Sequence, residues 1–173
     1  MCSRVSAFAV RRAVPEDGRG TSRLLHSVVA ERVHSAIDRA WNADEQRAYI
    51  QSLSDREALF VAVDAEGTII GSQSLERYSH VLTSMSHVAQ LGTFVLSEWR
   101  GGGVGRALFA ASSRFAVDAG YRKIVITVRA SNSSAQAFYG RLGFVACGRL
   151  RAQVLLDDRE DDEILMEYFL RET

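Results

Sequence analysis

The sequence of 173 residues is poor in several residue types, and each shortage argues against a class of protein. Its two cysteines, Cys2 and Cys147, are too few for a disulfide-stapled secreted domain, and their spacing matches no metal motif. Basic and acidic residues number 21 each, so no net field attracts nucleic acid. The longest apolar runs, such as ALFVAV and IVITV, are too short to cross a bilayer.

The other absences concern organisation and location. Four histidines without paired spacing give no sign of a zinc site. The first residues, MCSRVSAFAVRR, lack the continuous apolar segment of a secretory signal. There is one proline, Pro15, and no linker-like stretch. We therefore expect a single cytoplasmic domain over residues 1–173, with free thiols, no metal, and neither membrane nor nucleic acid as a partner.

Hydrophobic periodicity predicts an α/β fold with a mixed central sheet. After a first strand, AFAVRRA, apolar residues recur at helical spacing from Leu25 to Ile37, and Asn42 with Glu45 makes a capping box for a second helix. ALFVAV and TIIGSQSL, joined by the turn DAEG, predict a hairpin. The predicted order is β, α, α, β, β, β, α, β, α, β, β.

A glycine-rich stretch separates a predicted strand from a predicted helix, in FVLSEWRGGGVGRALF at 94–109. Free backbone N–H groups at a helix start, together with the helix dipole, form an anion site. Glycines let the backbone curve around a phosphate without a Cβ in the way. Four glycines framed by Arg100 and Arg106 favour that interpretation over simple close packing.

The identity of the anion follows from the spacing of this loop. The nucleoside triphosphate motif fails because Arg106 stands where its second glycine is needed, and no Lys-Ser/Thr follows. The dinucleotide fingerprint fails in both registers. The pattern that fits is Arg-x-x-Gly-x-Gly, formed by Arg100, Gly103 and Gly105.

A second motif lies in NSSAQAFYGRLGF, where Asn132 is followed seven residues later by Tyr139 and then by Leu-Gly-Phe at 142–144. With both motifs in this order, the sequence resembles the GCN5-related N-acetyltransferase (GNAT) family, and more narrowly its bacterial branch acting on small amines and amino acids. The resemblance runs from about Phe8 to the end and is strongest over 87–144.

The resemblance implies a GNAT fold: six to seven strands with about four helices, splayed where acetyl-coenzyme A binds as cosubstrate. Backbone groups of Phe94 and Val95 would pair with the pantetheine arm. Asn132 would bond the same arm or simply cap its helix, and Arg141 would reach the 3′-phosphate or remain a solvated surface residue. The residues expected around the pyrophosphate are Arg100, Gly101, Gly102, Gly103, Val104, Gly105 and Arg106.

The resemblance also implies a catalytic role for Tyr139 as general acid. A phenol pKa of about 10 and a thiol pKa of about 8.5 make proton transfer to the leaving thiolate nearly balanced. The base is less defined, because the strand HVAQLGTFV carries no carboxylate. His87 is the nearest titratable candidate, and Glu76, His80 or a chain of waters are alternatives.

The acceptor would be selected by residues 22–55 together with the loop at 78–85. We expect transfer of acetyl to a primary amine, of a small molecule or amino acid. A protein N-terminus or lysine remains an alternative acceptor, and a catalytically silent acyl-CoA sensor remains an alternative function. Family members commonly dimerise through the last strands, so a homodimer is a further expectation.

Overall fold

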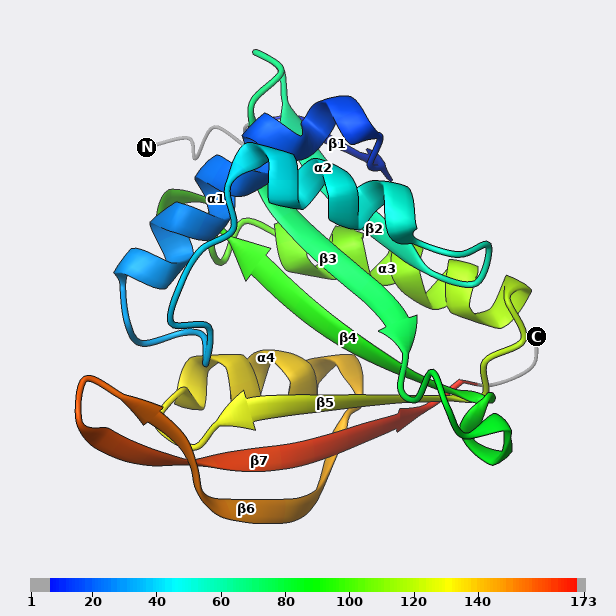
Figure 1. Cartoon of the computed structure of the whole chain (residues 1–173), viewed down its shortest axis with the longest axis vertical. Coiled ribbons are helices and arrows are strands. Elements are labelled where there is room, and N and C mark those ends of the chain that lie inside the picture. The colour runs from blue at the N-terminus through cyan, green and yellow to red at the C-terminus, as the bar shows by residue number, and fades with distance from the viewer. Residues whose placement is uncertain (1–6, 171–173) are drawn as a thin grey trace.

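The computed structural model describes residues 7–170, which form one seven-stranded sheet and four α-helices (Figure 1). The order across the sheet is β1-β2-β3-β4-β5-β7-β6, antiparallel except for β4 and β5. The strands are β1 (Phe8–Arg12), β2 (Ala58–Asp64), β3 (Ile69–Arg77), β4 (Val88–Val95), β5 (Lys123–Arg129), β6 (Val145–Leu156) and β7 (Arg159–Phe169). The helices are α1 (Gly18–Ala30), α2 (Ala43–Ser52), α3 (Val104–Asp118) and α4 (Ser133–Leu142). The predicted mixed sheet and element order are confirmed.

Local signals in the sequence account for several helix ends. The Asn42 side chain accepts from the N–H groups of residues 44 and 45, and Glu45 bonds back to the Asn42 N–H, which confirms the capping box. Asn132 caps α4, and Gly143 ends it in the left-handed region with φ of 101°. These caps satisfy backbone groups that a helix end would otherwise leave unpaired.

The first helix is shorter than its apolar spacing predicted. The periodicity extends to Ile37, but α1 ends at Ala30 and a loop follows up to α2. Arg32 has φ of 57°, a left-handed conformation that breaks the helix, and Val33 is exposed. This correction matters, because part of the loop enters the functional site.

The helices cover both faces of the sheet. Leu24 and Val28 of α1 pack on Val61 and Ile69 on one face. Leu108 of α3 lies in a cluster with residues 62 and 70 on the other face, which α4 also covers. The two helical layers are therefore separated by the sheet, and a ligand can connect them only where the sheet opens.

Such an opening exists between β4 and β5. These strands are paired only at Val88–Lys123, Ala89–Ile124 and Gln90–Val125. Beyond Gln90 they diverge, as Figure 1 shows, while β4 stays paired with β3 to its end. The predicted splay is confirmed, and it gives access to the middle of the sheet from both faces.

Two global features concern only residues 7–170. No helix there combines the length and apolar character needed to span a membrane. No group of three or more His, Cys, Asp or Glu side chains in that part could hold a metal ion. Cys147 is an exposed free thiol, and Cys2 lies outside the described residues.

Candidate active site

A cavity of about 790 Å³ occupies the opening between β4 and β5. It is lined by the second half of β4, the glycine loop, the end of β5, α4, and residues 34–37 of the loop after α1. Both sequence motifs therefore meet in one cavity, although they are far apart in the chain. Its volume lies within the usual range of ligand pockets.

The backbone of β4 presents free hydrogen-bonding groups to this cavity. Leu96 donates its N–H to the Ile70 carbonyl of β3, and the carbonyl of Val88 accepts from Tyr78, which directly follows β3. In an antiparallel pair this alternation turns the even-numbered residues of β4 toward β3 and the odd-numbered residues away from it. The backbone groups of Thr93 and the N–H of Val95 therefore face the opening without a partner in β5, while the Val95 carbonyl accepts from Arg100.

Phe94 contributes differently from the prediction. It lies opposite Ser72 of β3, so its backbone groups face β3 and not the opening. Its side chain points to the face covered by α1 and lines the cavity there. The Val95 N–H thus faces the opening, whereas the prediction of a ligand-facing Phe94 backbone is wrong and only the Phe94 side chain lines the cavity.

The glycine loop has the geometry of an anion cradle. Gly101 and Gly103 have φ of 78° and 89°, and a Cβ on either would enter open space. Gly103 is the N-cap of α3, so the N–H groups of residues 104–106 have no hydrogen-bond acceptor within the helix. These amides and the helix dipole favour a negatively charged group at this end of the cavity.

Gly105 has a second reason to be glycine. A Cβ there would lie 2.8 Å from the Phe138 ring, so the missing side chain lets α3 approach α4. Substitution of Gly103 would therefore strain the backbone without disturbing packing, whereas substitution of Gly105 would also disturb packing.

The side chains around the cavity carry net positive charge, with four arginines and one glutamate in the lining. Arg100 is held by Glu31 through two bonds of 2.7 Å, and its Nε donates to the Val95 carbonyl at 2.9 Å. The hydrogen bonds from Arg100 lower the pKa of Glu31. Arg106 and Arg141 are exposed at the rim and have no ion-pair partner within residues 7–170.

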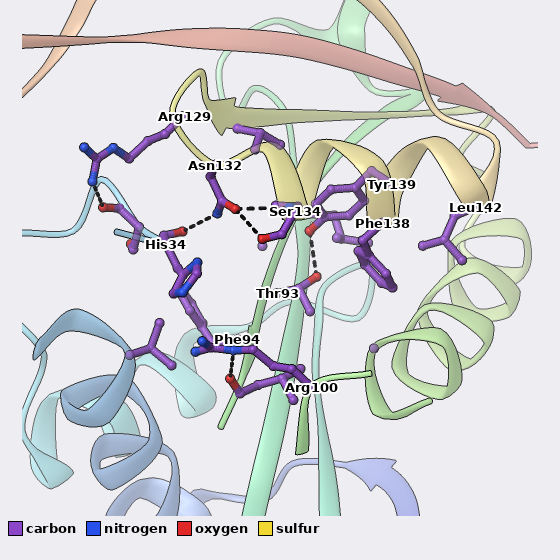
Figure 2. Close-up of a pocket in the computed structure, with 18 of the residues that line it drawn as sticks. His34, Thr93, Phe94, Arg100, Arg129, Asn132, Ser134, Phe138, Tyr139 and Leu142 are labelled. Carbon is purple, nitrogen blue, oxygen red and sulfur yellow. Dashed lines mark hydrogen bonds between the residues drawn. The ribbon is translucent and has the colours of Figure 1, made fainter. Parts of the chain in front are cut away.

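Tyr139 lies where the two halves of the sheet separate. Its hydroxyl donates to Thr93 Oγ1 at 2.8 Å (Figure 2). Gln73 Nε2 donates to the same oxygen at 2.8 Å. Tyr139 is 6 % exposed and Gln73 is fully buried. Burial raises the pKa of Tyr139 to about 12, against the opposing effect of the Thr93 hydrogen bond. The phenol therefore stays protonated at neutral pH.

Asn132 holds both the helix and the loop after α1. Its Oδ1 accepts from the Ala135 N–H at 3.1 Å and from the Ser134 hydroxyl at 2.9 Å, and its Nδ2 lies 3.4 Å from the His34 carbonyl (Figure 2). The capping alternative is thus confirmed. Because Asn132 also lines the cavity, a contact with a ligand is compatible with the cap.

The sequence pattern gave no sign that Arg129, at the end of β5, fastens this loop. Its Nη1 donates to the Arg32 carbonyl at 2.8 Å, and its Nε pairs with Asp161 at 2.8 Å. A single arginine forms no recognisable sequence motif, so only the tertiary structure shows that it bonds to this loop. Gln73 and Thr93 are likewise functional neighbours that sequence reasoning missed.

The candidate bases are dispersed. His87 precedes β4, six residues from Thr93, which corresponds to about 20 Å along a strand. It lies outside the cavity lining, as does the loop at 78–85, where His80 approaches Glu57 at 3.5 Å. Glu76 instead lines a second, smaller cavity. We therefore assign no proton-accepting role to His87.

Comparisons with known proteins agree with this arrangement of fold and site. The model of the acetyltransferase (GNAT) family matches residues 25–144. The chain is 32% identical to aminoglycoside N(6')-acetyltransferase type 1 of Stenotrophomonas maltophilia, over 80% of this chain and 87% of that protein. It is 33% identical to N-alpha-acetyltransferase 30 of Schizosaccharomyces pombe, over 54% of this chain and 61% of that protein.

An acetyltransferase of Salmonella typhimurium, solved with its cofactor acetyl-CoA, has the same fold, with a TM-score of 0.87 at 18% identity. The alignment covers 97% of this chain and 96% of that one. The fold and site thus define an acyltransferase that uses acetyl-CoA. The chain belongs to the GNAT acetyltransferase family.

Proposed function

We propose that this protein transfers the acetyl group of acetyl-CoA to a primary amine of a small molecule. The observation that carries the proposal is the meeting of two groups in one cavity: the open amides at the start of α3, and the protonated Tyr139 hydroxyl held by Thr93. The first suits a pyrophosphate, and the second suits a leaving thiolate.

The cosubstrate would lie along the opening with its pyrophosphate on the glycine loop. The backbone amides of residues 101–106 would bind the phosphates, and Arg106 and Arg141 would add positive charge. The pantetheine amides would pair with the backbone groups of Thr93 and with the N–H of Val95, in place of β5. One N–H in this row would donate to the thioester carbonyl oxygen as negative charge develops there.

Chemistry then requires a neutral amine and a proton donor for sulfur. The amine nitrogen attacks the carbonyl carbon, the C–S bond breaks, the nitrogen loses one proton to water, and the departing thiolate accepts a hydrogen bond from the Tyr139 hydroxyl and leaves as the thiol after protonation. When Tyr139 turns its hydrogen to sulfur, Thr93 can donate its own hydroxyl hydrogen to the phenol oxygen. Gln73 supports this reversal by continuing to donate to Thr93 Oγ1.

The acceptor side favours a small substrate. A second cavity, of about 150 Å³, adjoins the first at Ile37 and Phe94, on the face covered by α1 and α2. That volume is below the usual range for drug-sized ligands and suits an amine with few carbons. This observation supports a small molecule over a protein N-terminus.

The test is calorimetric titration with acetyl-CoA, followed by a thiol-release assay over small amines. We expect micromolar binding, far tighter than for adenosine diphosphate, and acetylation of at least one small amine. Binding without turnover on any amine would favour the silent sensor, and turnover on peptides alone would favour a protein acetyltransferase. No binding of acetyl-CoA would refute both the enzyme and the sensor.

A further inference from the structure

The smaller cavity has a composition that identifies what it can hold. It lies between α1, α2 and the β3–β4 pair, and Ser72, Ser74 and Glu76 project into it from alternate positions of β3. Trp41 and Tyr49 form another wall, with their rings edge to face at 5.5 Å. The cavity therefore combines an aromatic wall, small hydroxyls and one carboxylate.

Glu76 is a partly buried carboxylate without a cationic partner. The Tyr49 hydroxyl donates to its Oε1, which leaves Oε2 available. The nearby cations Arg77 and His80 pair with Glu57 instead. Among residues 7–170, no Lys, Arg or His makes an ion pair with Glu76. A partly buried carboxylate whose hydrogen-bond partner is a neutral phenol would be stabilised by a cation, so this site favours one supplied by a ligand.

The walls around Glu76 suit an ammonium group. Tyr49 stays neutral, since burial and the Glu76 charge both raise its pKa. Aromatic rings attract cations, and the cavity lining holds no lysine or arginine that could bind a carboxylate. An amino acid with a free carboxylate would therefore find no cationic partner in this lining.

The position of Glu76 along β3 requires an extended ligand. Thr93, which holds Tyr139, lies opposite Gln73, and Glu76 is three residues further along β3, about 10 Å away. The Glu76 side chain lies on the face covered by α1 and α2, opposite Tyr139, so a ligand held by Glu76 must extend along that face of β3 to reach the opening, and a five-carbon chain is a suitable probe.

We propose that the smaller cavity binds a second ammonium group of the acceptor, so that the acceptor is a compact diamine held by Glu76 at one end and acetylated at the other. This inference rests on the proposed N-acetyltransferase function. It adds a substrate class, and it gives Glu76 a binding role in place of the proton-accepting role considered from sequence.

The experiment compares three molecules with one chain length: cadaverine with two ammonium groups, pentylamine with one, and 5-aminopentanoate with a carboxylate at the far end. Acetylation kinetics are measured for the native protein, Glu76→Gln and the control Glu66→Gln, which removes the same charge from an exposed turn. Calorimetry of each amine with the CoA-saturated protein gives the binding constant independently of turnover.

We expect the native protein to prefer cadaverine by at least tenfold in kcat/KM. Glu76→Gln should reduce kcat/KM and affinity for cadaverine about ten- to hundredfold, while pentylamine turnover and the Glu66→Gln variant stay unchanged. An equal loss with pentylamine would overturn the proposal in favour of a catalytic base. Equal use of all three amines, or preference for 5-aminopentanoate, would also overturn it.

The two proposals can fail separately. Cadaverine bound through Glu76 without any acetylation would refute the proposed transferase function and support the ammonium site. Acetylation of small amines with no effect of Glu76→Gln would support the transferase and refute the ammonium site.

Discussion

Replacement of Tyr139 by phenylalanine tests how the leaving sulfur is stabilised. The sequence suggested nearly balanced proton transfer, but burial raises the pKa of the phenol to about 12. Transfer to a thiolate of pKa about 8.5 is then uphill by roughly 3.5 units, or about 5 kcal/mol. The hydroxyl therefore acts mainly as a hydrogen-bond donor to the developing thiolate, with an effect of about 1.5–3 kcal/mol.

That free energy corresponds to a reduction of kcat by about ten- to hundredfold in Tyr139→Phe, with the Kd of acetyl-CoA nearly unchanged. Steady-state thiol release and calorimetry measure the two quantities. Tyr121→Phe is the matched control, because it also removes a buried hydroxyl, bonded to the Arg56 carbonyl at 3.0 Å, but lies outside the cavity. A Tyr139→Phe kcat within twofold of native would refute the reasoning, as would an alkaline activity loss near pH 9 that vanishes in the variant.

Three further outcomes are expected. Gly103→Val should raise the Kd of acetyl-CoA at least tenfold by calorimetry, whereas Gly67→Val, equally strained but in the β2–β3 turn, should leave it unchanged. Thr93→Val should lower kcat about tenfold without weakening acetyl-CoA binding, and an unchanged kcat would remove Thr93 from the site. Asn42→Ala should reduce the unfolding free energy by about 1 kcal/mol in urea titration, with acetyl-CoA binding intact.

Local features made much of this molecule predictable from its sequence. Three kinds of signal depend only on neighbouring residues: the glycine loop, the capping residues and the spacing of apolar residues. The local structure can therefore be predicted from short segments. The order of helices and strands could be predicted for the same reason. That the glycine loop and α4 share one site could be predicted only from the resemblance to the family. Tyr139 could be singled out only because its spacing from Asn132 matched a motif.

The missed features depend on contacts between distant segments. The helical spacing of apolar residues continued to Ile37, but α1 ends at Ala30. The loop that follows is held by a hydrogen bond from Arg129, which is distant in the sequence, to the Arg32 carbonyl. Gln73 and Thr93 looked like ordinary strand residues, since their role arises only when β3, β4 and α4 come together. The ion pair between Arg100 and Glu31 could not be predicted from the sequence either, because the two residues are far apart in the chain.

The alternation of β4 explains how one strand can serve three partners. Its even-numbered backbone groups bond to β3, and its odd-numbered ones face the opening left by β5. Side chains alternate at the same time, so that Thr93 contacts Tyr139 on one face while Phe94 borders the acceptor cavity on the other. Thiolate stabilisation and amine selection are thereby placed on opposite faces, one residue apart. A substitution at Phe94 should accordingly change amine preference more than acetyl-CoA affinity, and one at Thr93 should do neither but slow the chemical step.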